Sequence, residues 1–362
     1  MKTQILFIGK EFRINEAFTD YVKRQALRHV DAINAITFLE ENDKNLFLYI
    51  SKAIEEYRNL LIVTTPQSYP ATSKIVATLF EDNLVAKENF LVPSKAFAVE
   101  ANSFAIKKGA HTINLIRARI GQKLPNILLD IQSESTYFYI FGLEEERIIE
   151  TIYPIAKSYD IGLILTQETP ELYKVFAYKK KFGDLAMFVQ NAKLMLPQNL
   201  IITDNIFEYL IERFSALHRT VTFAESCTGG LLASMLTKVP GSSNIFHGSL
   251  VTYANEIKHA WLGVQNDTLQ AFGAVSEETV EEMLRGALKV ADADYAIAIS
   301  GIAGPGGATP TKPVGTVVVG CRSKTEEIIR TMHFRGDRNY IQYQAAMYGI
   351  RLLFEVAKEE LF

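Results

Sequence analysis

One run of nine residues restricts the folds open to this chain more than any other feature. Residues 222–230 read T-F-A-E-S-C-T-G-G, and an apolar helical pattern follows over residues 231–236. The run predicts a buried strand, a tight turn with two glycines and a helix that begins at the turn. Backbone N–H groups at a helix start attract anions, and glycines let a ligand approach the backbone closely. We therefore expect a phosphate, or the oxyanion of an acyl transfer, to bind at this turn.

Length, charge and cysteine content set the broad class of the protein. A chain of 362 residues exceeds one ordinary domain core, so two or three domains are expected. With a formal net charge of −3, the chain has no net positive charge to attract nucleic acid or an anionic membrane, and we expect neither as a partner. The two cysteines, Cys227 and Cys321, supply neither a disulfide framework nor a zinc-ligand spacing, which fits a reducing cytoplasm.

No segment of the sequence predicts a signal peptide or a membrane span. The apolar run near the N-terminus is short and is interrupted by Lys10, Glu11 and Arg13, so we interpret it as a buried first strand. No run of about 18 apolar residues occurs. We expect a cytoplasmic protein.

Strand-like and helix-like segments alternate along the chain, which indicates an α/β fold with mostly parallel sheets. We expect an N-terminal three-layer α/β domain at residues 1–160, a short connecting subdomain at 161–203 and a C-terminal α/β/α sandwich at 204–362. The first domain would end with strands at residues 126–131 and 136–141 and a helix at 144–159.

Five polar clusters in the C-terminal part follow predicted strands or open a helix. They lie at residues 225–230, 241–243, 253–258, 300–307 and 335–338. Ligands of open α/β sheets bind at strand ends, so we expect these clusters to converge. They hold no histidine placed for a conventional triad, but they supply serines, a tyrosine and a lysine. A lysine whose pKa falls on burial can act as general base toward a serine, and such a pair cleaves amides or esters.

The clusters suggest a role for each candidate side chain. Lys258 would be the base, while Tyr253 and Ser226 would relay a proton or orient the pair. Arg338 would bind a phosphate or carboxylate with two hydrogen bonds. We interpret Cys227 as a small buried residue and not as a nucleophile, because no partner histidine is evident.

Each of these residues also has an ordinary structural explanation. Ser226 and Thr228 are good helix caps, and Ser243 follows a Pro-Gly pair that favours a turn. Lys258 and Arg338 suit a solvated helix surface. The case for a catalytic site therefore rests on the set of residues and not on one of them.

The motifs of residues 222–338 resemble those of the C-terminal domain of the competence/damage-inducible CinA family, the nicotinamide mononucleotide deamidases. They occur in the order typical of that family. They are A-E-S-C-T-G-G-L-L-A at 224–233, V-P-G-S-S at 239–243, Y-A-N-E-I-K-H-A-W-L-G-V at 253–264, G-A-V-S-E-E at 273–278, S-G-I-A-G-P at 300–305, K-P-V-G-T-V at 312–317 and F-R-G-D-R at 334–338.

The resemblance implies a reaction and a set of site residues. The carboxamide of nicotinamide mononucleotide would be hydrolysed to nicotinic acid mononucleotide and ammonia, with no metal or redox cofactor. The implied catalytic residues are Ser243, Lys258, Ser226 and Tyr253, and the implied substrate-binding residues are Thr228, Gly229, Gly230, Ser300, Gly301 and Arg338. We expect Ser243 to be the nucleophile and Lys258 its base, with Ser226 as the alternative nucleophile.

The N-terminal part resembles the molybdopterin-binding-like domain of the same family, whose loop reads T-G-G-L-G-P-T-x-D-D. Here residues 65–74 read T-P-Q-S-Y-P-A-T-S-K, so the loop glycines are missing and Ser73 and Lys74 replace the paired aspartates. A divalent metal needs hard oxygen ligands, which a lysine ammonium does not provide. We predict that the ADP-ribose pyrophosphatase activity of such domains is lost and that this part serves scaffolding or dimer contacts.

A different class of function remains open from the sequence. The degenerate N-terminal part would also suit a non-catalytic nucleotide-binding protein, or a scaffold associated with competence and recombination. Apolar residues on the last predicted helix exceed what one buried face needs, so we expect a homodimer or a higher homo-oligomer. These residues are Ile341, Met347, Leu352 and Phe354.

Overall fold

The computed structural model describes residues 2–87, 90–129 and 134–362. Its contacts divide the chain into two compact units, Met1–Ser133 and Glu134–Phe362. Both units mix helices and strands, which confirms the predicted α/β class. Within the described ranges, no helix combines the length and the apolar character needed to cross a lipid bilayer.

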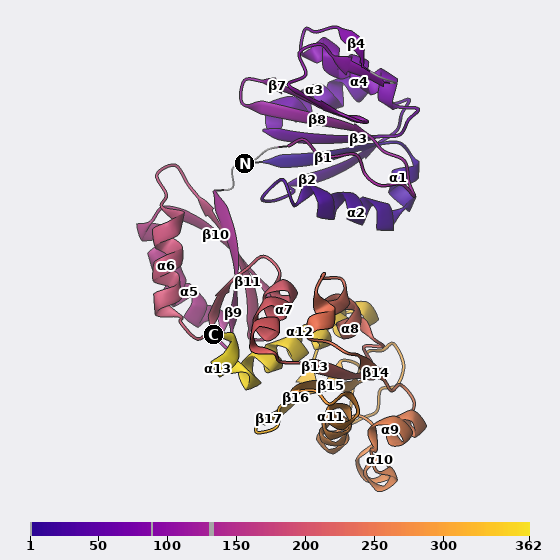
Figure 1. Ribbon diagram of the computed structural model, residues 1–362, viewed down its shortest axis with the longest axis vertical. Coiled ribbons are helices and arrows are strands. Elements are labelled where there is room, and N and C mark those ends of the chain that lie inside the picture. Colours follow the sequence, from indigo (N-terminus) through magenta and orange to yellow (C-terminus); the bar gives the residue numbers. More distant parts are fainter. Residues whose placement is uncertain (1, 88–89, 130–133) are drawn as a thin grey trace. The chain divides into compact units, whose positions relative to one another are not determined.

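The first unit is a three-layer α/β domain built on a six-stranded sheet of order β2-β1-β3-β8-β7-β6. Its elements are β1 (Thr3–Ile8), α1 (Glu11–Ile14), α2 (Glu16–Ala26), β2 (Ala35–Leu39), α3 (Leu46–Glu56), β3 (Asn59–Thr64), α4 (Tyr69–Leu79), β6 (Ala98–Glu100), β7 (Ser103–Lys108) and β8 (His111–Arg117), with a separate hairpin of β4 (Leu84–Lys87) and β5 (Phe90–Pro93). Strands β2, β1, β3 and β8 are parallel, and β7 and β6 are antiparallel additions. Alternate side chains of β1 enter two cores: Leu6 and Ile8 pack with α3 and α4, and Ile5 and Phe7 pack with α1 and α2. Figure 1 shows these helix pairs on opposite sides of the sheet.

The loop that would carry a phosphate in this first unit is closed by its own hydroxyl groups. The hydroxyls of Thr65 and Ser68 lie 3.0 Å apart, and Ser68 also donates to the carbonyl of Ile8 at 2.9 Å. Ser73 is fully buried in α4, and Lys74 faces solvent. The first unit therefore presents no carboxylate at the two positions, 73 and 74, where the resemblance implies aspartates.

The predicted domain boundary at residue 160 is wrong. A four-stranded antiparallel sheet of order β10-β11-β9-β12 begins earlier, with β9 (Ser135–Phe141), and includes β10 (Ile161–Thr169), β11 (Leu172–Lys179) and β12 (Leu200–Ile202). Helices α5 (Glu145–Ser158) and α6 (Leu185–Met195) cover one face of this sheet. The expected helix at 144–159 is thus present as α5, but it packs against β9 and belongs to the second unit, not to the first. Residues 126–129 form no strand, and the rest of the strand expected at 126–131 lies outside the described residues.

The C-terminal part of the second unit is the predicted α/β/α sandwich. Its sheet has the order β14-β13-β15-β16-β17. Strands β14, β13 and β15 are parallel to one another, β16 pairs antiparallel with β15, and β17 pairs antiparallel with β16. The elements are α7 (Ile206–Leu217), β13 (Val221–Glu225), α8 (Leu231–Thr237), η1 (Ser242–Asn244), β14 (Ser249–Val251), α9 (Asn255–Leu262), α10 (Asn266–Phe272), α11 (Glu277–Ala291), β15 (Tyr295–Gly301), β16 (Thr316–Arg322), β17 (Glu327–His333), α12 (Arg338–Val356) and α13 (Lys358–Leu361). Phe223 and Ile297 face α7, α8 and α12, whereas Ala224 and Ala298 face α9 and α11.

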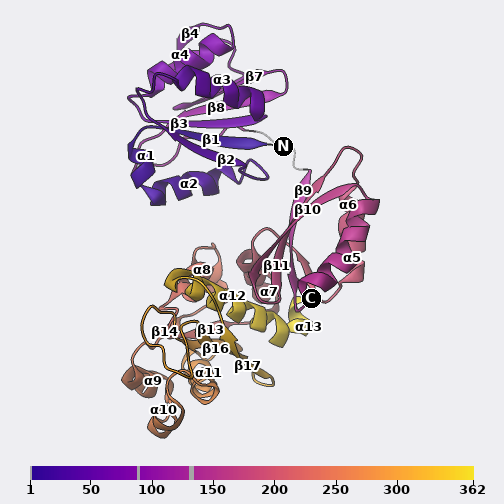
Figure 2. The ribbon, with the colours of Figure 1, turned by 180° about the vertical axis from the view of Figure 1, so that it is seen from behind.

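Helix α12 is covered on two sides within the chain. Its residues Ile341, Met347, Leu352 and Phe354 are at most 3% exposed. The ring of Phe354 stacks on that of Phe141 in β9, with centroids 4.4 Å apart. Figures 1 and 2 show α12 between the β9–β12 sheet and the β13–β17 sheet. The apolar excess of this helix is therefore satisfied inside one chain and gives no reason to expect an oligomer.

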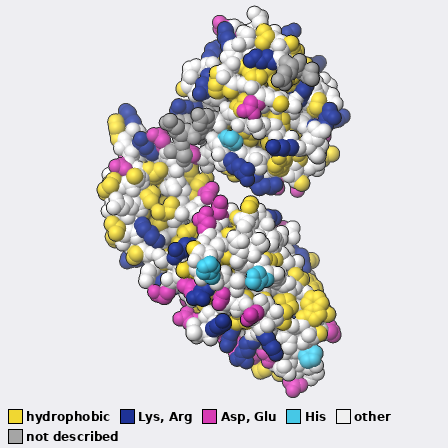
Figure 3. All heavy atoms as spheres, in the orientation of Figure 1, with side chains coloured by type: hydrophobic (Ala, Val, Ile, Leu, Met, Phe, Trp, Pro, Cys, Tyr) yellow, Lys and Arg dark blue, Asp and Glu magenta, His cyan; other side chains and the backbone are white. Residues whose placement is uncertain are grey.

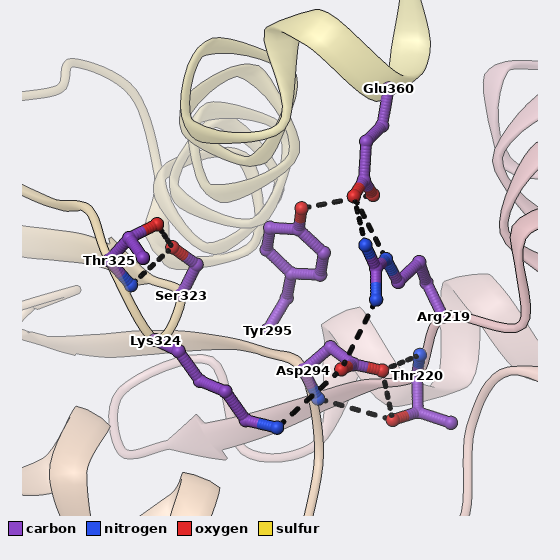
Figure 4. Close-up of polar contacts among 8 residues, drawn as sticks. All are labelled: Arg219, Thr220, Asp294, Tyr295, Ser323, Lys324, Thr325 and Glu360. Carbon is purple, nitrogen blue, oxygen red and sulfur yellow. Dashed lines mark hydrogen bonds and ion pairs between the residues drawn. The ribbon is translucent and has the colours of Figure 1, made fainter.

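An ion-pair network lies at the end of the sandwich where β13 and β15 begin (Figure 4). The Arg219 guanidinium donates to Glu360 at 2.9 and 2.7 Å and lies 3.8 Å from Asp294. The hydroxyl of Tyr295 donates to Glu360 at 3.0 Å, and Asp294 accepts the backbone N–H of Thr220 at 2.9 Å. The network connects α13 to the first residues of both strands.

We expect Arg219→Ala to lower the free energy of unfolding by about 1 kcal/mol, because the carboxylate of Glu360 loses its charged partner. The side chain of Arg219 is 42% exposed, so solvent screening keeps the effect small. Urea unfolding of the full chain measures this change. Lys180→Ala, at an exposed lysine outside the helices and strands, is the control and should change the value by less than about 0.5 kcal/mol. Equal effects of the two variants would show that the network does not stabilise the sandwich.

Candidate active site

The turn after β13 places Ser226 at the carboxyl end of the sheet. The backbone N–H of Ser226 donates to the carbonyl of Ile299 at 2.9 Å, which sets the turn beside the end of β15. Gly229 and Gly230 adopt φ values of 62° and 95°, in the left-handed region that favours glycine. The two glycines in this motif are therefore required by the backbone that carries the serine.

The amino end of α8 is occupied by the protein's own carboxylate. Glu225 is fully buried, and its oxygens accept the backbone N–H groups of Gly230, Leu232 and Ala233 at 3.1, 3.1 and 3.0 Å. A carboxylate in this position satisfies unpaired amides and complements the helix dipole. These three amides are therefore not available to a ligand anion, and the anion site expected at this turn would need other donors. Glu225 instead fixes the helix relative to the strand.

Lys258 of α9 meets Ser226 in a buried environment. Its Nζ lies 3.0 Å from Ser226 Oγ, 2.8 Å from the carbonyl oxygen of Thr252 and 3.1 Å from that of Tyr253. Lys258 is 1% exposed, and no carboxylate in the described part of the chain forms an ion pair with it. Burial without a counter-charge lowers the pKa of its amine.

These contacts suit a neutral amine that accepts a proton. A neutral amine has two N–H bonds and one lone pair, and the two carbonyl oxygens take the N–H bonds. In this neutral form the lone pair would face the hydroxyl of Ser226, whereas the protonated amine donates to Ser226 Oγ. A neutral amine in this position can act as a general base toward a serine.

The structure does not bring Ser243 to Lys258, so the expectation that these two residues pair is wrong. Ser243 is exposed in η1, at the opposite end of β13. The carbonyl of Ile245 accepts the N–H of Val221, the first residue of β13, whereas Ser226 follows the last one. The sequence could not reveal this, because Ser226 lies 32 positions before Lys258 and Ser243 is nearer to it in the chain, while neither motif shows which end of β13 its turn reaches.

The side chains of Tyr253 and Arg338 lie together, and in the described structure neither forms a hydrogen bond to Ser226 Oγ or Lys258 Nζ. The Tyr253 backbone carbonyl orients Lys258, while its hydroxyl accepts a hydrogen bond from Arg338 Nη2 at 3.1 Å. Arg338 Nη1 donates to the carbonyl of Gly304 at 2.7 Å. Both side chains are exposed, with Tyr253 at 61%. They are placed to meet a ligand at the rim of the site.

The remaining predicted binding residues lie at the ends of β13 and β15. Ser300 is 1% exposed and donates to the carbonyl of Ala274 at 2.6 Å, so its hydroxyl is committed to the loop before α11. Gly301 lies so close to β16 that a Cβ would stand 2.8 Å from the Cα of Val317. Thr228 has a buried hydroxyl with no hydrogen-bond partner in the described structure. Of these residues, Thr228 is the one whose hydroxyl is not committed to a hydrogen bond within the described structure.

The C-terminal part of the chain is similar to known proteins. A CinA-like protein of Thermotoga neapolitana is 46% identical over 152 residues, which is 42% of this chain and 37% of that protein. A putative competence-damage inducible protein of Clostridium beijerinckii is 40% identical over 228 residues, 62% of this chain and 54% of that protein. The aligned part is thus about half or less of these relatives' length. Residues 203–357 match the family model described as the CinA C-terminal domain.

The chain belongs to the CinA family. The membership rests on its C-terminal domain, which holds both Ser226 and Lys258. A solved structure, the competence/damage inducible protein CihA of Agrobacterium tumefaciens, is 37% identical, covers 42% of this chain and 96% of its own, and has a TM-score of 0.41.

Two residues of this CinA C-terminal domain have a positioning role that the sequence did not predict. Glu225 holds α8, as described above, and Gln342 of α12 donates to the carbonyl of Cys227 at 2.6 Å. Both fix the backbone on either side of Ser226. An acidic residue a few positions ahead of a helix is a capping signal that could have pointed to Glu225. The contact of Gln342 spans 115 positions in sequence and carries no local signal.

Cys227 is not poised as a nucleophile. It is 4% exposed, and burial raises the pKa of its thiol to about 12. The thiol is therefore protonated at neutral pH and unreactive. The interpretation of Cys227 as a small buried residue agrees with this environment.

Proposed function

We propose that the chain hydrolyses the carboxamide of nicotinamide mononucleotide and releases ammonia and nicotinic acid mononucleotide. The observation that carries the proposal is the 3.0 Å contact of Lys258 Nζ with Ser226 Oγ, at a lysine that burial makes less basic. The choice of substrate rests on the resemblance of the motifs to the nicotinamide mononucleotide deamidases. The alternative is a nucleotide-binding scaffold without turnover.

In the first half of the reaction, Lys258 takes the proton of Ser226 as Oγ attacks the carboxamide carbon. The carbonyl becomes a tetrahedral oxyanion, which collapses and breaks the carbon–nitrogen bond. The departing nitrogen takes the proton from Lys258 and leaves as ammonia. An ester of Ser226 remains.

In the second half, Lys258 deprotonates a water that attacks the ester carbon. Collapse of the second oxyanion breaks the bond to Ser226 Oγ, which recovers its proton from Lys258. The products are the free carboxylic acid and the original enzyme. Atoms and charges balance over the two steps.

The turn also offers donors for the oxyanion. The backbone N–H groups of Cys227 and Thr228 make no hydrogen bond to another residue in the described part of the chain, and the Thr228 hydroxyl is buried and unpartnered. The amide that follows a serine nucleophile is a common oxyanion donor. One such donor contributes about 3 kcal/mol of transition-state stabilisation. Arg338 at the rim is suited to the substrate phosphate.

Ammonia release from nicotinamide mononucleotide by the full chain, with a metal chelator present, tests the proposal. We expect equal amounts of ammonia and nicotinic acid mononucleotide. A folded sample that binds the mononucleotide without producing ammonia would favour the scaffold.

The rate is expected to rise with pH. Lys258 acts as a base only when it is neutral, so kcat/KM should increase as this amine loses its proton. The inflection should lie below 10.5, the value of an ordinary lysine, because burial lowers the pKa of Lys258. The same shift makes the folded state bind fewer protons than the unfolded one, so this group's contribution to stability falls as pH drops through the lowered pKa. A rate that falls over that range would contradict the role of Lys258.

The first unit is predicted to lack ADP-ribose pyrophosphatase activity. Ser73 and Lys74 supply no carboxylate for a divalent cation where relatives carry aspartates. We expect no release of AMP from ADP-ribose by the full chain with magnesium or manganese. Metal-dependent hydrolysis that a chelator abolishes would refute the prediction.

A further inference from the structure

Strand β10 leaves one edge of the four-stranded sheet without a partner. It is the first strand in the order β10-β11-β9-β12, and among the described residues it pairs only with β11. The strand is nine residues long, which is long for an exposed edge. Its outer N–H and C=O groups can be satisfied by a further strand.

The side chains of this edge lack the features that usually prevent pairing. Residues 161–167 read I-G-L-I-L-T-Q and contain no charge and no proline. Ile164 is 57% exposed, although it lies at the centre of the strand. The first charged residues on either side are Asp160 and Glu168. Both already bond within the chain, Asp160 to the N–H of Phe182 and Glu168 to the hydroxyl of Tyr343.

An open groove runs beside the same edge. It has a volume of about 300 Å³ and lies between the first residues of β10 and the last turns of α5. Leu163 lines it from the strand, and Tyr153 and Lys157 line it from the helix. Ile149 and Tyr153 of α5 are each 40% exposed, and Figure 3 shows hydrophobic side chains gathered over α5 and α6.

We propose that β10 pairs in antiparallel register with β10 of a second copy of this chain, centred on Ile164. In this register Ile164 faces its own copy, Leu163 faces Leu165, and Gly162 faces Thr166. The pairs are apolar or neutral, as cross-strand neighbours require. The side chains of Leu165 and Gln167 from the second copy then enter the groove beside Leu163.

The charges explain why a second copy fits and where its overlap ends. A neutral edge of seven residues favours a neutral strand, and this chain supplies one of the same length. Beyond residues 161–167, Asp160 would face Glu168 of the other copy, and such like charges oppose pairing. The β-bulge between Gln167 and Thr169 also disrupts the ladder at that end. The continuous pairing is therefore limited to these seven residues.

Ile164→Cys in the full chain tests the register. Facing residues of an antiparallel pair have Cα atoms about 4.5 to 5.5 Å apart, within the range that a disulfide spans. Mild oxidation should therefore link the variant into a covalent dimer. The native cysteines Cys227 and Cys321 are buried and should not react. Thr166→Cys is the matched control: its counterpart in the second copy is Gly162, so it should remain unlinked.

Sedimentation equilibrium supplies the second measurement. Ile164→Lys changes an exposed side chain, so the fold should be kept, and the dimer should weaken at least about tenfold because two like charges face each other. A wild-type chain that stays monomeric, or a dimer that Ile164→Lys leaves unchanged, would overturn the proposal. Cross-linking of Thr166→Cys as fast as Ile164→Cys would overturn the register.

Discussion

Ser226→Ala is expected to reduce ammonia release from nicotinamide mononucleotide by at least about a thousandfold, whereas Ser243→Ala should retain activity within about twofold. Of the two serines, Ser226 is the one whose Oγ lies within hydrogen-bond distance of Lys258 Nζ, at 3.0 Å, whereas Ser243 is exposed at the other end of β13. Removing the nucleophile leaves oxyanion stabilisation and binding, which alone support slow turnover. The measurement is kcat and KM for both variants in the same assay.

The pair of serine variants also controls for folding. Ser226 is 8% exposed and loses only one hydroxyl, so thermal unfolding of both variants should resemble that of the unmodified chain. If Ser243→Ala abolishes turnover while Ser226→Ala keeps it, the assignment of the nucleophile from the 3.0 Å contact is wrong.

Lys258→Met is expected to lower kcat by at least about a hundredfold with a small change in KM. Methionine keeps the length of the side chain and removes the group that accepts the proton. Lys258→Arg should be equally inactive, because a guanidinium does not lose its proton in proteins. The loss must appear in kcat, since Lys258 touches the nucleophile and not the predicted phosphate site at Arg338.

The lysine variants separate an enzyme from a scaffold. An enzyme loses turnover in Lys258→Met and retains binding of the mononucleotide, which calorimetry measures. A scaffold would show no turnover in any form of the chain. Turnover by Lys258→Met comparable to that of the unmodified chain would require another base.

The elements around the site could be predicted well, because they are local in sequence. Residues 222–236 have the strand, turn and helix pattern that the structure shows as β13 and α8. Lys258 and Ser226 were both found among polar clusters at strand ends, since parallel strands bring such clusters to one edge. Which serine meets the lysine depends on the path of the chain between α8 and β14, and no local pattern encodes that path.

The sequence did not predict the domain boundary, or the element that covers α12, for a related reason. A strand followed by a helix, as in β9 and α5, looks the same whether it closes one domain or opens the next. The apolar side chains of α12 suggested a second subunit, but Phe141 of β9 covers Phe354 within the chain. Periodicity shows that a face is buried and not which element buries it.

Covalent capture of the nucleophile tests the central claim most directly. A mononucleotide analogue with a sulfonyl fluoride in place of the carboxamide would react with an activated side chain, and mass spectrometry of peptides identifies the residue modified. We expect a single modification on Ser226, slowed at least about a hundredfold in Lys258→Met. Modification of Ser243 or Cys227, or labelling of Ser226 that does not depend on Lys258, would contradict it.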